Sequence, residues 1–439
     1  MSRAVSAPHA VTTPRPPRAK TGLGLLLLAI SVSIAAYASV GLAQHGRLPA
    51  NLVIYGVLLA GAYVAAWFVV RLAAPGADPV LFPTAALLGG LGLAMLYRLR
   101  PEVASQQTVW LFVGLGVFVA ILLLLRDDRQ LDAYTYTIGL AGIVLLLLPI
   151  LPGVGYEING ARLWAKIGPV SFQPAELGKI LIVIFLASYL TAKRELLAAG
   201  VGRFGLPRIK DLGPIGLAWS ASLAVLFLEK DLGASLLFFA AFVLMLWVAT
   251  GRGSYLVIGL VLMAIGSILG YLAFAHVQTR VDYWLHALNP ATVHDLGFGQ
   301  LAQGWFALAS GGLVGTGLGQ GSPTLIPYVG SDFIFAAFGE ELGMIGASAL
   351  LLLYLVLIGR GLRIALERTD GFGKLLATGL TTVIALQTFV IVAGVTRVIP
   401  LTGVPLPLVS YGGSSKVATF MILALLVRVS AGPWEQSRG

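Results

Sequence analysis

The sequence predicts an all-α integral membrane protein, a polytopic bundle whose helices cross the bilayer about twelve times. Of its 439 residues, 58% are hydrophobic and 11% are charged, and the mean hydropathy is +0.90. Soluble domains carry roughly 25% charged residues, so lipid must cover most of this surface. The apolar runs approach the ~20 residues that a spanning helix needs. They lack the alternation of a barrel strand, which favours helices.

The predicted elements follow one another in chain order. Residues 1–21 form a polar tail that we expect to be disordered and cytoplasmic. The first apolar run partly resembles a signal peptide, but its length and polar tail favour an uncleaved anchor. The runs lie at 22–43, 50–72, 80–97, 105–125, 133–151, 172–192, 213–228, 232–249, 254–276, 333–359, 375–395 and 406–427. The domains are therefore the tail at 1–21, a helix pair at 22–72, a core at 73–430 with a large outer loop at 277–332 between helices 9 and 10, and a cytoplasmic tail at 431–439.

Charge and composition set the orientation and exclude several functions. Most of the 29 Lys and Arg residues fall in alternate loops, which places both termini in the cytoplasm. The net charge of +10 does not indicate nucleic acid, because the basic residues form no soluble domain. The absence of cysteine excludes thiol chemistry. Walker, GxSxG and HExxH motifs are absent, which argues against nucleotide hydrolysis and zinc proteolysis.

Four polar segments, at 152–179, 229–231, 277–332 and 396–416, fall at the predicted outer face. In the first, Pro174 sits where a helix would begin, and Glu176 and Lys179 share one face of that helix. Two such charges are costly in a membrane unless they face protein or water. They predict either a structural ion pair or a polar cleft for an anionic head group. Trp164 fits the cleft or a membrane interface.

The second and third segments carry carboxylates. Glu229, Lys230 and Asp231 form either a tight outer turn or part of a site. The length of the loop 277–332 indicates function, and its apolar, glycine-rich part is expected to dip into the membrane or to form an interfacial helix. Asp295 alone would be an ordinary solvated residue. The run SDFIFAAFGEELG then adds Asp332, predicted to cap the next helix, with Glu340 and Glu341.

The fourth segment, VPLPLVSYGGSSKVA, interrupts an apolar run with two prolines and several small residues. A helix that begins inside a membrane leaves free backbone N–H groups, which bind anions. Lys416 adds positive charge one turn later. The segment therefore predicts an anion site, or else a kink that serves packing.

Together the four segments resemble the SEDS family (shape, elongation, division and sporulation), the RodA/FtsW group. The family patterns N-G-A-x-R-W and F-Q-P-S-E-x-x-K are similar to NGARLW and FQPAELGK here. E-x-D-L-G is matched by EKDLG. G-x-G-L-G and T-D-F-I-F-A-x-x-x-E-E-L-G are matched by GTGLGQG and SDFIFAAFGEELG. L-P-L-(I/V)-S-Y-G-G-S-S is matched by LPLVSYGGSS. The resemblance covers residues 150–430, and the extra N-terminal helix pair is similar to the longer actinobacterial RodA-like form.

The resemblance implies a peptidoglycan glycosyltransferase of the bacterial cytoplasmic membrane that polymerises lipid II with a class B penicillin-binding transpeptidase. The family's essential aspartate precedes a G-Y-Q-x-x-Q stretch, which reads GFGQLAQ here, so the catalytic base is assigned to Asp295, with Asp282 second. The implied substrate-binding residues are Arg162, Trp164, Glu176, Lys179, Gln300, Gln303, Ser410, Ser414, Ser415 and Lys416. The implied supporting residues are Glu229, Asp231, Asp332, Glu340 and Glu341.

The chain departs from the family pattern near these residues. Asp295 is followed by leucine instead of proline, the tyrosine of the glutamine stretch is lost, and Arg162 is displaced by Leu163. A flippase for lipid-linked precursors and a non-catalytic scaffold for the transpeptidase therefore stay open as alternatives. No cofactor is required by the motifs, and a carboxylate-held Mg²⁺ or Mn²⁺ is the one ion that the chemistry leaves open.

Overall fold

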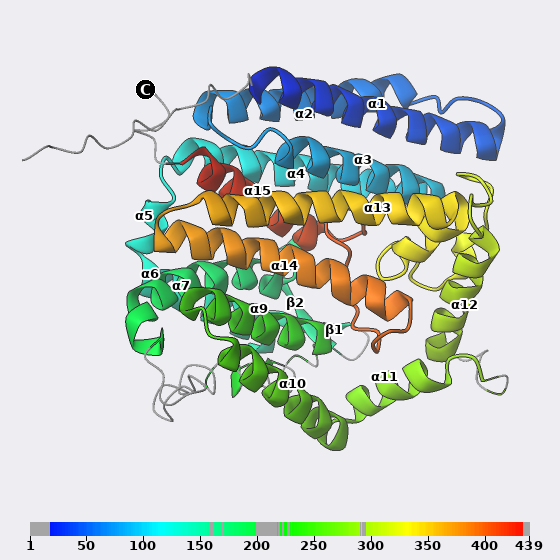
Figure 1. The fold of residues 1–439 in the computed structure, drawn as a ribbon. Helices are drawn as coiled ribbons and strands as arrows, with labels where there is room; N and C mark the ends of the chain where they lie inside the picture. Colours follow the sequence, from blue (N-terminus) through cyan, green and yellow to red (C-terminus); the bar gives the residue numbers. More distant parts are fainter. Residues whose placement is uncertain are drawn as a thin grey trace, which may run out of the picture.

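A computed structural model describes residues 18–158, 161–168, 170–198, 217, 220–221, 224–225, 229, 231–289, 291 and 296–432 (Figure 1). Among these residues, ten helices are long and apolar enough to cross a membrane, which confirms a helical membrane protein. They are α1 (Arg18–His45), α2 (Leu52–Ala73), α3 (Leu81–Leu99), α4 (Pro101–Leu124), α7 (Pro174–Ala198), α9 (Leu232–Thr250), α10 (Gly253–Ala273), α13 (Ile334–Glu367), α14 (Gly371–Val395) and α15 (Gly413–Ala431).

The other two predicted spans differ from these ten. The run at 133–151 forms a shorter helix, α6 (Thr135–Leu147), extended by the 3-10 turn η1 (Leu148–Ile150) after the four-residue α5 (Arg129–Asp132). The run at 213–228 lies mostly outside the described residues, as do residues 1–17 of the predicted tail. Helix α1 already begins at Arg18, earlier than expected. Helix α15 begins later than the predicted run, because Pro405 and Pro407 have no N–H for helical hydrogen bonds.

A small antiparallel sheet, which the sequence analysis does not anticipate, precedes α7. Its strands β1 (Gly155–Ile158), β2 (Ala161–Ile167) and β3 (Val170–Phe172) pair in chain order. Tyr156 lies opposite Trp164, and Ala165 lies opposite Phe172. Helix α7 then starts at Pro174, where the sequence predicted a helix start.

The large loop contains two helices, α11 (Ala275–His286) and α12 (Leu296–Gly311), and the 3-10 turn η3 (Pro323–Leu325). In Figure 1, α12 runs across one end of the bundle instead of parallel to its long helices. Trp284 donates from Nε1 to the carbonyl of Arg397 (2.9 Å), and Trp305 donates to that of Val395 (3.2 Å). These bonds fasten both helices to the end of α14.

Helix α13 is interrupted at Gly343, whose φ of +67° suits glycine. The interruption leaves backbone N–H groups of α13 without helical partners, and carbonyl groups of the loop that follows α12 accept from them. The N–H of Met344 donates to the carbonyl of Gly312 (2.9 Å), and that of Ile345 donates to the carbonyl of Leu313 (3.1 Å). Irregular backbone is tolerated in a membrane protein where such partners exist.

A buried ion pair fixes the glycine-rich loop before α13. Arg98, at the end of α3, donates from Nε to Glu341 Oε1 (2.7 Å), and the other oxygen of Glu341 accepts from the N–H of Gly319 (2.8 Å). Glu340 accepts from the N–H of Ser322 (2.7 Å). The two carboxylates that the sequence marked as supporting residues therefore hold this loop.

Both described termini lie at the same end of the bundle. Gly22, near the start of α1, packs against Pro79, and the N–H of Asp78 donates to Ser430 Oγ near the end of α15 (3.1 Å). Arg428 donates to the carbonyls of Ala73 (2.8 Å) and Leu122 (2.6 Å) at this end. This arrangement agrees with an even number of crossings.

The Arg98–Glu341 pair gives a stability prediction. Glu341→Gln leaves Arg98 buried without a carboxylate, and such a loss costs about 3–5 kcal/mol. We expect a clear fall in the Tm of the purified protein in detergent. Glu367→Gln is the matched control, because its pair with Arg363 is exposed and worth at most ~1 kcal/mol. An equal Tm for the two variants would contradict the structural role of Glu341.

Candidate functional site

A cavity of about 970 Å³ opens at the end of the bundle opposite the termini. Its walls come from the sheet, the starts of α7, α9 and α15, and helices α4, α11 and α12. Eight residues predicted from the sequence line it: Trp164, Glu176, Lys179, Asp231, Gln300, Asp332, Ser414 and Ser415. The fold thus brings parts of all four polar segments to one place.

Glu176 and Lys179 form the ion pair expected from their spacing. The Lys179 ammonium donates to Glu176 Oε2 at 2.6 Å, and both side chains are more than nine-tenths buried. Both still reach the cavity. Lys179 has three donors, and only one is used by Glu176. The pair can therefore serve packing and also present positive charge to a ligand.

Asp231, Asp332 and Arg280 form a second charged group in the cavity wall. Asp231 caps α9 by accepting from the N–H of Ala234 (2.9 Å). Burial raises the pKa of Asp332, and the Ser331 hydroxyl and the Arg280 charge oppose that rise. Burial likewise raises the pKa of Asp231 against the opposing effects of the Ala234 N–H and Arg280. Carboxylates perturbed in this way inside a cleft are typical of functional sites.

Asp332 does not cap α13, contrary to the prediction. The residue before that helix is Phe333, and no side chain caps its N-terminus. The Asp332 carboxylate instead faces the cavity beside Gly403 and Arg280.

The start of α15 presents backbone and hydroxyl groups to the cavity. Gly412, Gly413, Ser414 and Ser415 all line it. Ser414 Oγ accepts from the N–H of Gln173 (2.9 Å), which joins the starts of α15 and α7. Ser415 Oγ is buried and has no hydrogen-bond partner among the described residues. This end has the free N–H groups of a helix N-terminus and an unused hydroxyl, which suits an anion.

Ser410 lies behind the cavity wall and joins neighbouring segments through its hydrogen bonds. Its hydroxyl donates to the carbonyl of Ser331 (2.5 Å) and accepts from the N–H of Leu406 (2.9 Å). Its carbonyl accepts from Gln107 Nε2 on α4 (3.1 Å). Ser410 therefore holds the wall together and is not itself among the lining residues.

Several other predicted residues lie away from the cavity lining. Arg162 is exposed on β2, with Nε 3.8 Å from Glu157 Oε2. Lys416 is buried in α15, and its ammonium has no hydrogen-bond partner among the described residues. Gln303, Glu229, Glu340 and Glu341 are also not among the described residues that line the cavity.

The two candidates for the catalytic base differ in their surroundings. Asp295 lies outside the described residues, but it immediately precedes α12, whose Gly297 and Gln300 line the cavity. Asp282 lies on α11, about half exposed, and its Oδ1 is 2.7 Å from Nδ1 of His286. Asp282 is not among the described lining residues.

Sequence reasoning missed several lining residues, of which Arg280, Gln387 and Trp110 matter most. Arg280 donates to the carbonyl of Leu401 (2.8 Å) as well as acting on both aspartates. A glutamine inside the apolar run 375–395 was a usable signal for Gln387. Trp110 had no signal, because its contact with Gly413 joins segments about three hundred positions apart in the chain.

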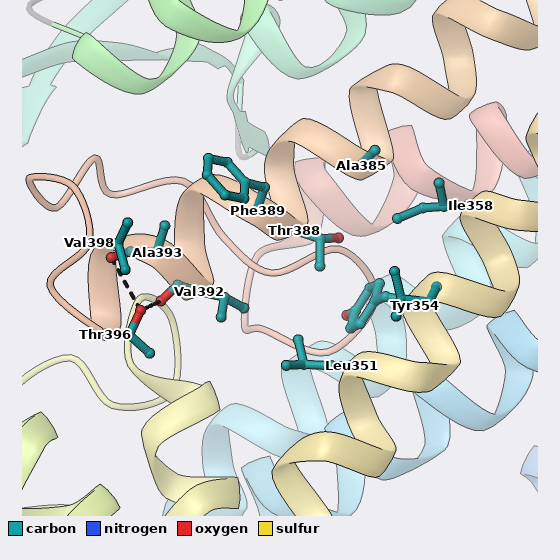
Figure 2. A pocket seen from close by; sticks show the side chains of 11 residues that line it. Leu351, Tyr354, Ile358, Ala385, Thr388, Phe389, Val392, Ala393, Thr396 and Val398 are labelled. Carbon is teal, nitrogen blue, oxygen red and sulfur yellow. Dashed lines mark hydrogen bonds between the residues drawn. The ribbon is translucent and has the colours of Figure 1, made fainter.

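A second hollow lies between α13 and α14 and is apolar (Figure 2). Its volume is about 360 Å³, and its lining includes no charged residue. The polar atoms of its wall are already bonded within the chain. Tyr354 donates to the carbonyl of Pro407 (2.5 Å), and Thr396 donates to that of Val392 (2.8 Å). This groove has no carboxylate, histidine or lysine, and its tyrosine is bonded to a backbone carbonyl, so the charged cavity is the candidate site.

Comparison with known proteins identifies relatives along nearly the whole chain. Residues 83–433 match the family FTSW_RODA_SPOVE, described as cell cycle protein. The peptidoglycan glycosyltransferase RodA of Mycobacterium tuberculosis (strain H37Rv) is 45% identical, over 98% of this chain and 94% of that protein.

Two solved structures share the fold. A chain from a study of structural coordination of polymerization and crosslinking by a peptidoglycan synthase complex is 28% identical, with a TM-score of 0.65. The alignment covers 81% of this chain and 97% of that one. The rod shape determining protein RodA of Thermus thermophilus is 27% identical, with a TM-score of 0.59, over 81% of this chain and 96% of that one.

The Glu176–Lys179 pair can be tested for a purely structural role. Lys179→Met leaves a buried carboxylate alone and should lower the Tm, because an unpaired buried charge is costly. The double variant Glu176→Gln/Lys179→Met removes both charges and should recover most of that loss. Thermal unfolding in detergent measures both. A double variant less stable than Lys179→Met would contradict this account of the pair.

Proposed function

Because the chain belongs to the FtsW/RodA/SpoVE family of cell cycle proteins, that is, the SEDS family, we propose that it is a peptidoglycan glycosyltransferase that polymerises lipid II. The cavity carries the proposal. It gathers buried carboxylates and cations and an anion-binding helix start at one end of a membrane bundle, where a lipid-linked sugar pyrophosphate could reach them.

The cavity should face outward, with both termini in the cytoplasm. The termini share one end of the bundle, and the cavity opens at the other. Arg360, Arg363, Arg368 and Arg428 all lie toward the end that holds the termini. An excess of basic residues on one side marks the cytoplasmic face. The protein would then act at the outer face of the cytoplasmic membrane.

Polymerisation joins a sugar 4-hydroxyl to the anomeric carbon of a second sugar that bears polyprenyl pyrophosphate. The new C–O bond forms as the bond to pyrophosphate breaks, and the pyrophosphate leaves with the electron pair. Asp295 is the proposed base that takes the hydroxyl proton, which is worth roughly 10²–10⁴-fold. Asp295 comes two residues before Gly297 in the sequence, and Gly297 lines the cavity, which supports this role.

The leaving pyrophosphate gathers negative charge and needs cations or N–H donors. Lys179 and Arg280 supply the positive charge of the cavity wall. The start of α15 supplies backbone N–H groups and the unused Ser415 hydroxyl. Apolar lining residues such as Leu237 and Phe238 of α9 suit the lipid end of the substrate.

In this proposal, a divalent ion arrives bound to the substrate pyrophosphate. Among the described residues, no group of three or more His, Cys, Asp or Glu side chains could hold a metal. Mg²⁺ is commonly held by one or two carboxylates together with substrate phosphates. Asp231 and Asp332 could contribute in that way to a Mg²⁺ or Mn²⁺ carried by the pyrophosphate, supplying charge neutralisation.

A class B penicillin-binding transpeptidase is the proposed partner. A similar solved chain belongs to a peptidoglycan synthase complex in which polymerization and crosslinking are coordinated. The alternatives are a flippase and a non-catalytic scaffold. Purified protein in liposomes with lipid II and Mg²⁺, with and without the transpeptidase, distinguishes them: glycan chains indicate a polymerase, translocation without chains indicates a flippase, and transpeptidase binding alone indicates a scaffold.

The base assignment predicts a sharp contrast between two aspartates in that assay. Asp295→Asn should reduce chain formation by at least about 10²-fold, because the hydroxyl loses its proton acceptor. Asp282→Asn should keep the wild-type rate, because Asp282 is exposed and paired with His286. Gel analysis of labelled glycan chains measures both. Full activity in Asp295→Asn with loss in Asp282→Asn would overturn the assignment.

Arg280 predicts a change in pH dependence. Its charge opposes the rise in pKa of Asp231 and Asp332, so Arg280→Gln should raise both pKa values further. If the ionised carboxylates hold the substrate's cation, the loss of rate should be greater at low pH than at high pH. The acid limb of the pH–rate profile should therefore shift to higher pH. Arg363→Gln, at the opposite end, is the control, and an equal loss at every pH would count against this role.

A further inference from the structure

The N-terminal helices α1 and α2 lie outside residues 83–433, the part of the chain that matches the family. In Figure 1 they run side by side along one edge of the bundle, over α3 and α4, and contacts pair α1 with α3 and α2 with α4. Nothing in the proposed chemistry uses them. Their contacts with α3 nevertheless connect them to the wall of the cavity.

Helix α1 packs against α3 where Ser33 meets Gly90, and this contact leaves no space for a larger side chain at position 90. A Cβ at Gly90 would lie 2.5 Å from Ser33 Cβ, so only glycine allows this approach. Nearby, the rings of Tyr37 and Tyr97 stack with centroids 4.2 Å apart. Small residues permit close approach of membrane helices, and van der Waals packing then drives their association.

The opposite face of α3 touches the cavity wall. Successive residues are ~100° apart around a helix, so Gly90 and Gly92 point in nearly opposite directions. A Cβ at Gly92 would lie 2.6 Å from the carbonyl oxygen of Val409 and 2.7 Å from its Cα. One turn later, the Leu96 side chain lies against Gly330. Helix α3 therefore lies between the N-terminal pair and two loop segments.

Those two segments form part of the cavity. The N–H of Tyr411 donates to the carbonyl of Gly330 (2.8 Å), which joins the segments to each other. Ser331, Asp332, Tyr411 and Gly412, which follow Gly330 and Val409 within three positions, line the cavity. A shift of α3 would therefore move these lining residues.

The end of α1 makes a second, separate contact with the loop that Glu341 holds. A Cβ at Gly319 would lie 2.8 Å from Ala43 Cβ. Gln44 also donates to the carbonyl of Arg98 (3.3 Å), the residue that pairs with Glu341. Helix α1 therefore supports the same end of the bundle at two places.

Helix α3 is also unsuited to face lipid. It is the least apolar of the ten spans, and most of its residues are buried. Burial of this kind requires a cover, and α1 provides a large part of it, together with α4 and α13.

We propose that the α1–α2 pair is a positioning element for the glycosyl transfer. It presses α3 against the segments 330–332 and 409–412 and so fixes the cavity wall that they carry. The proposal rests on the proposed function, and it assigns to α1 an effect on the rate of catalysis through α3 without any contact with substrate.

The test is a size exchange across the α1–α3 contact. Gly90→Ala should push α1 away from α3 and lower kcat for lipid II polymerisation about tenfold, less than the ~10²-fold that a 1 Å misplacement can cost. KM should stay within about twofold, since no binding group is removed. The double variant Gly90→Ala/Ser33→Gly restores the space and should return kcat to within about twofold of wild type. Gly24→Ala, on α1 with nothing within 4 Å, is the control and should behave as wild type.

The outcomes of this kcat assay can be distinguished from a failure of the proposed function. Wild-type protein that makes no glycan chains in the same liposomes would refute the polymerase assignment itself. With active wild-type protein, an undiminished kcat in Gly90→Ala, or a loss that Ser33→Gly does not rescue, would overturn the positioning role. Rescue of kcat in the double variant supports it.

A second pair covers the case in which Gly90→Ala does not fold. Gly319→Ala places a methyl group against Ala43, and Ala43→Gly removes the clash. Because Gly319 has a φ of +88°, alanine is strained there in any case. Gly317→Ala, at φ +104°, controls for that strain, because the three heavy atoms nearest to its new methyl group all belong to Gln320 of the same loop. A larger fall in kcat for Gly319→Ala than for Gly317→Ala, reversed by Ala43→Gly, supports the proposal, and equal falls without reversal overturn it.

Discussion

The hydrogen bonds of Ser410 are the constraint on which the site depends. The segment before α15 cannot be helical, because its prolines lack donors, so its backbone must find partners elsewhere. Ser410 bonds to Ser331 and Leu406, and its carbonyl accepts from Gln107. Three segments far apart in the chain are thereby held together. The free start of α15 then faces a cavity and not lipid.

The two ends of the bundle use charge differently. At the cavity end, Lys179 and Arg280 share space with carboxylates and keep unused hydrogen-bonding capacity, which is what a site for a charged substrate needs. At the opposite end, arginines bond to backbone carbonyls and aspartates. Arg428 donates to the carbonyls of Ala73 and Leu122, and Arg368 donates to Asp128 (2.9 Å). The charges at the terminal end are thus bonded mainly to the protein itself, whereas Lys179 and Arg280 keep donors that a bound ligand could use.

The site could be predicted in its parts but not as a whole. The spacing of Glu176 and Lys179 was enough to predict their contact, because residues three apart share a helix face. Ser410 was expected to bind substrate and Glu340 and Glu341 to support the site, but a polar residue in a motif can either line a site or hold its wall. In the structure, all three side chains hydrogen-bond to the backbone of neighbouring segments and so hold those segments in place. Arg280 and Trp110 carried no local signal, because the residues that they contact or act on lie about 50 to 300 positions away in the chain.

The amino-acid sequence is enough to assign the class of the protein: hydrophobic runs of spanning length dictate helices in lipid, and four ordered polar motifs indicate the family. It also located the motifs at one side of the membrane through the distribution of charge. The folded chain was needed to show that α3 touches both the N-terminal pair and the cavity wall, and that Glu341 holds a loop while Asp332 faces the cavity. The difference lies in how far along the chain each interaction reaches. Hydropathy, capping and helix periodicity act between neighbours in sequence, whereas close packing at Gly90 and Gly92 depends on which distant backbone arrives there.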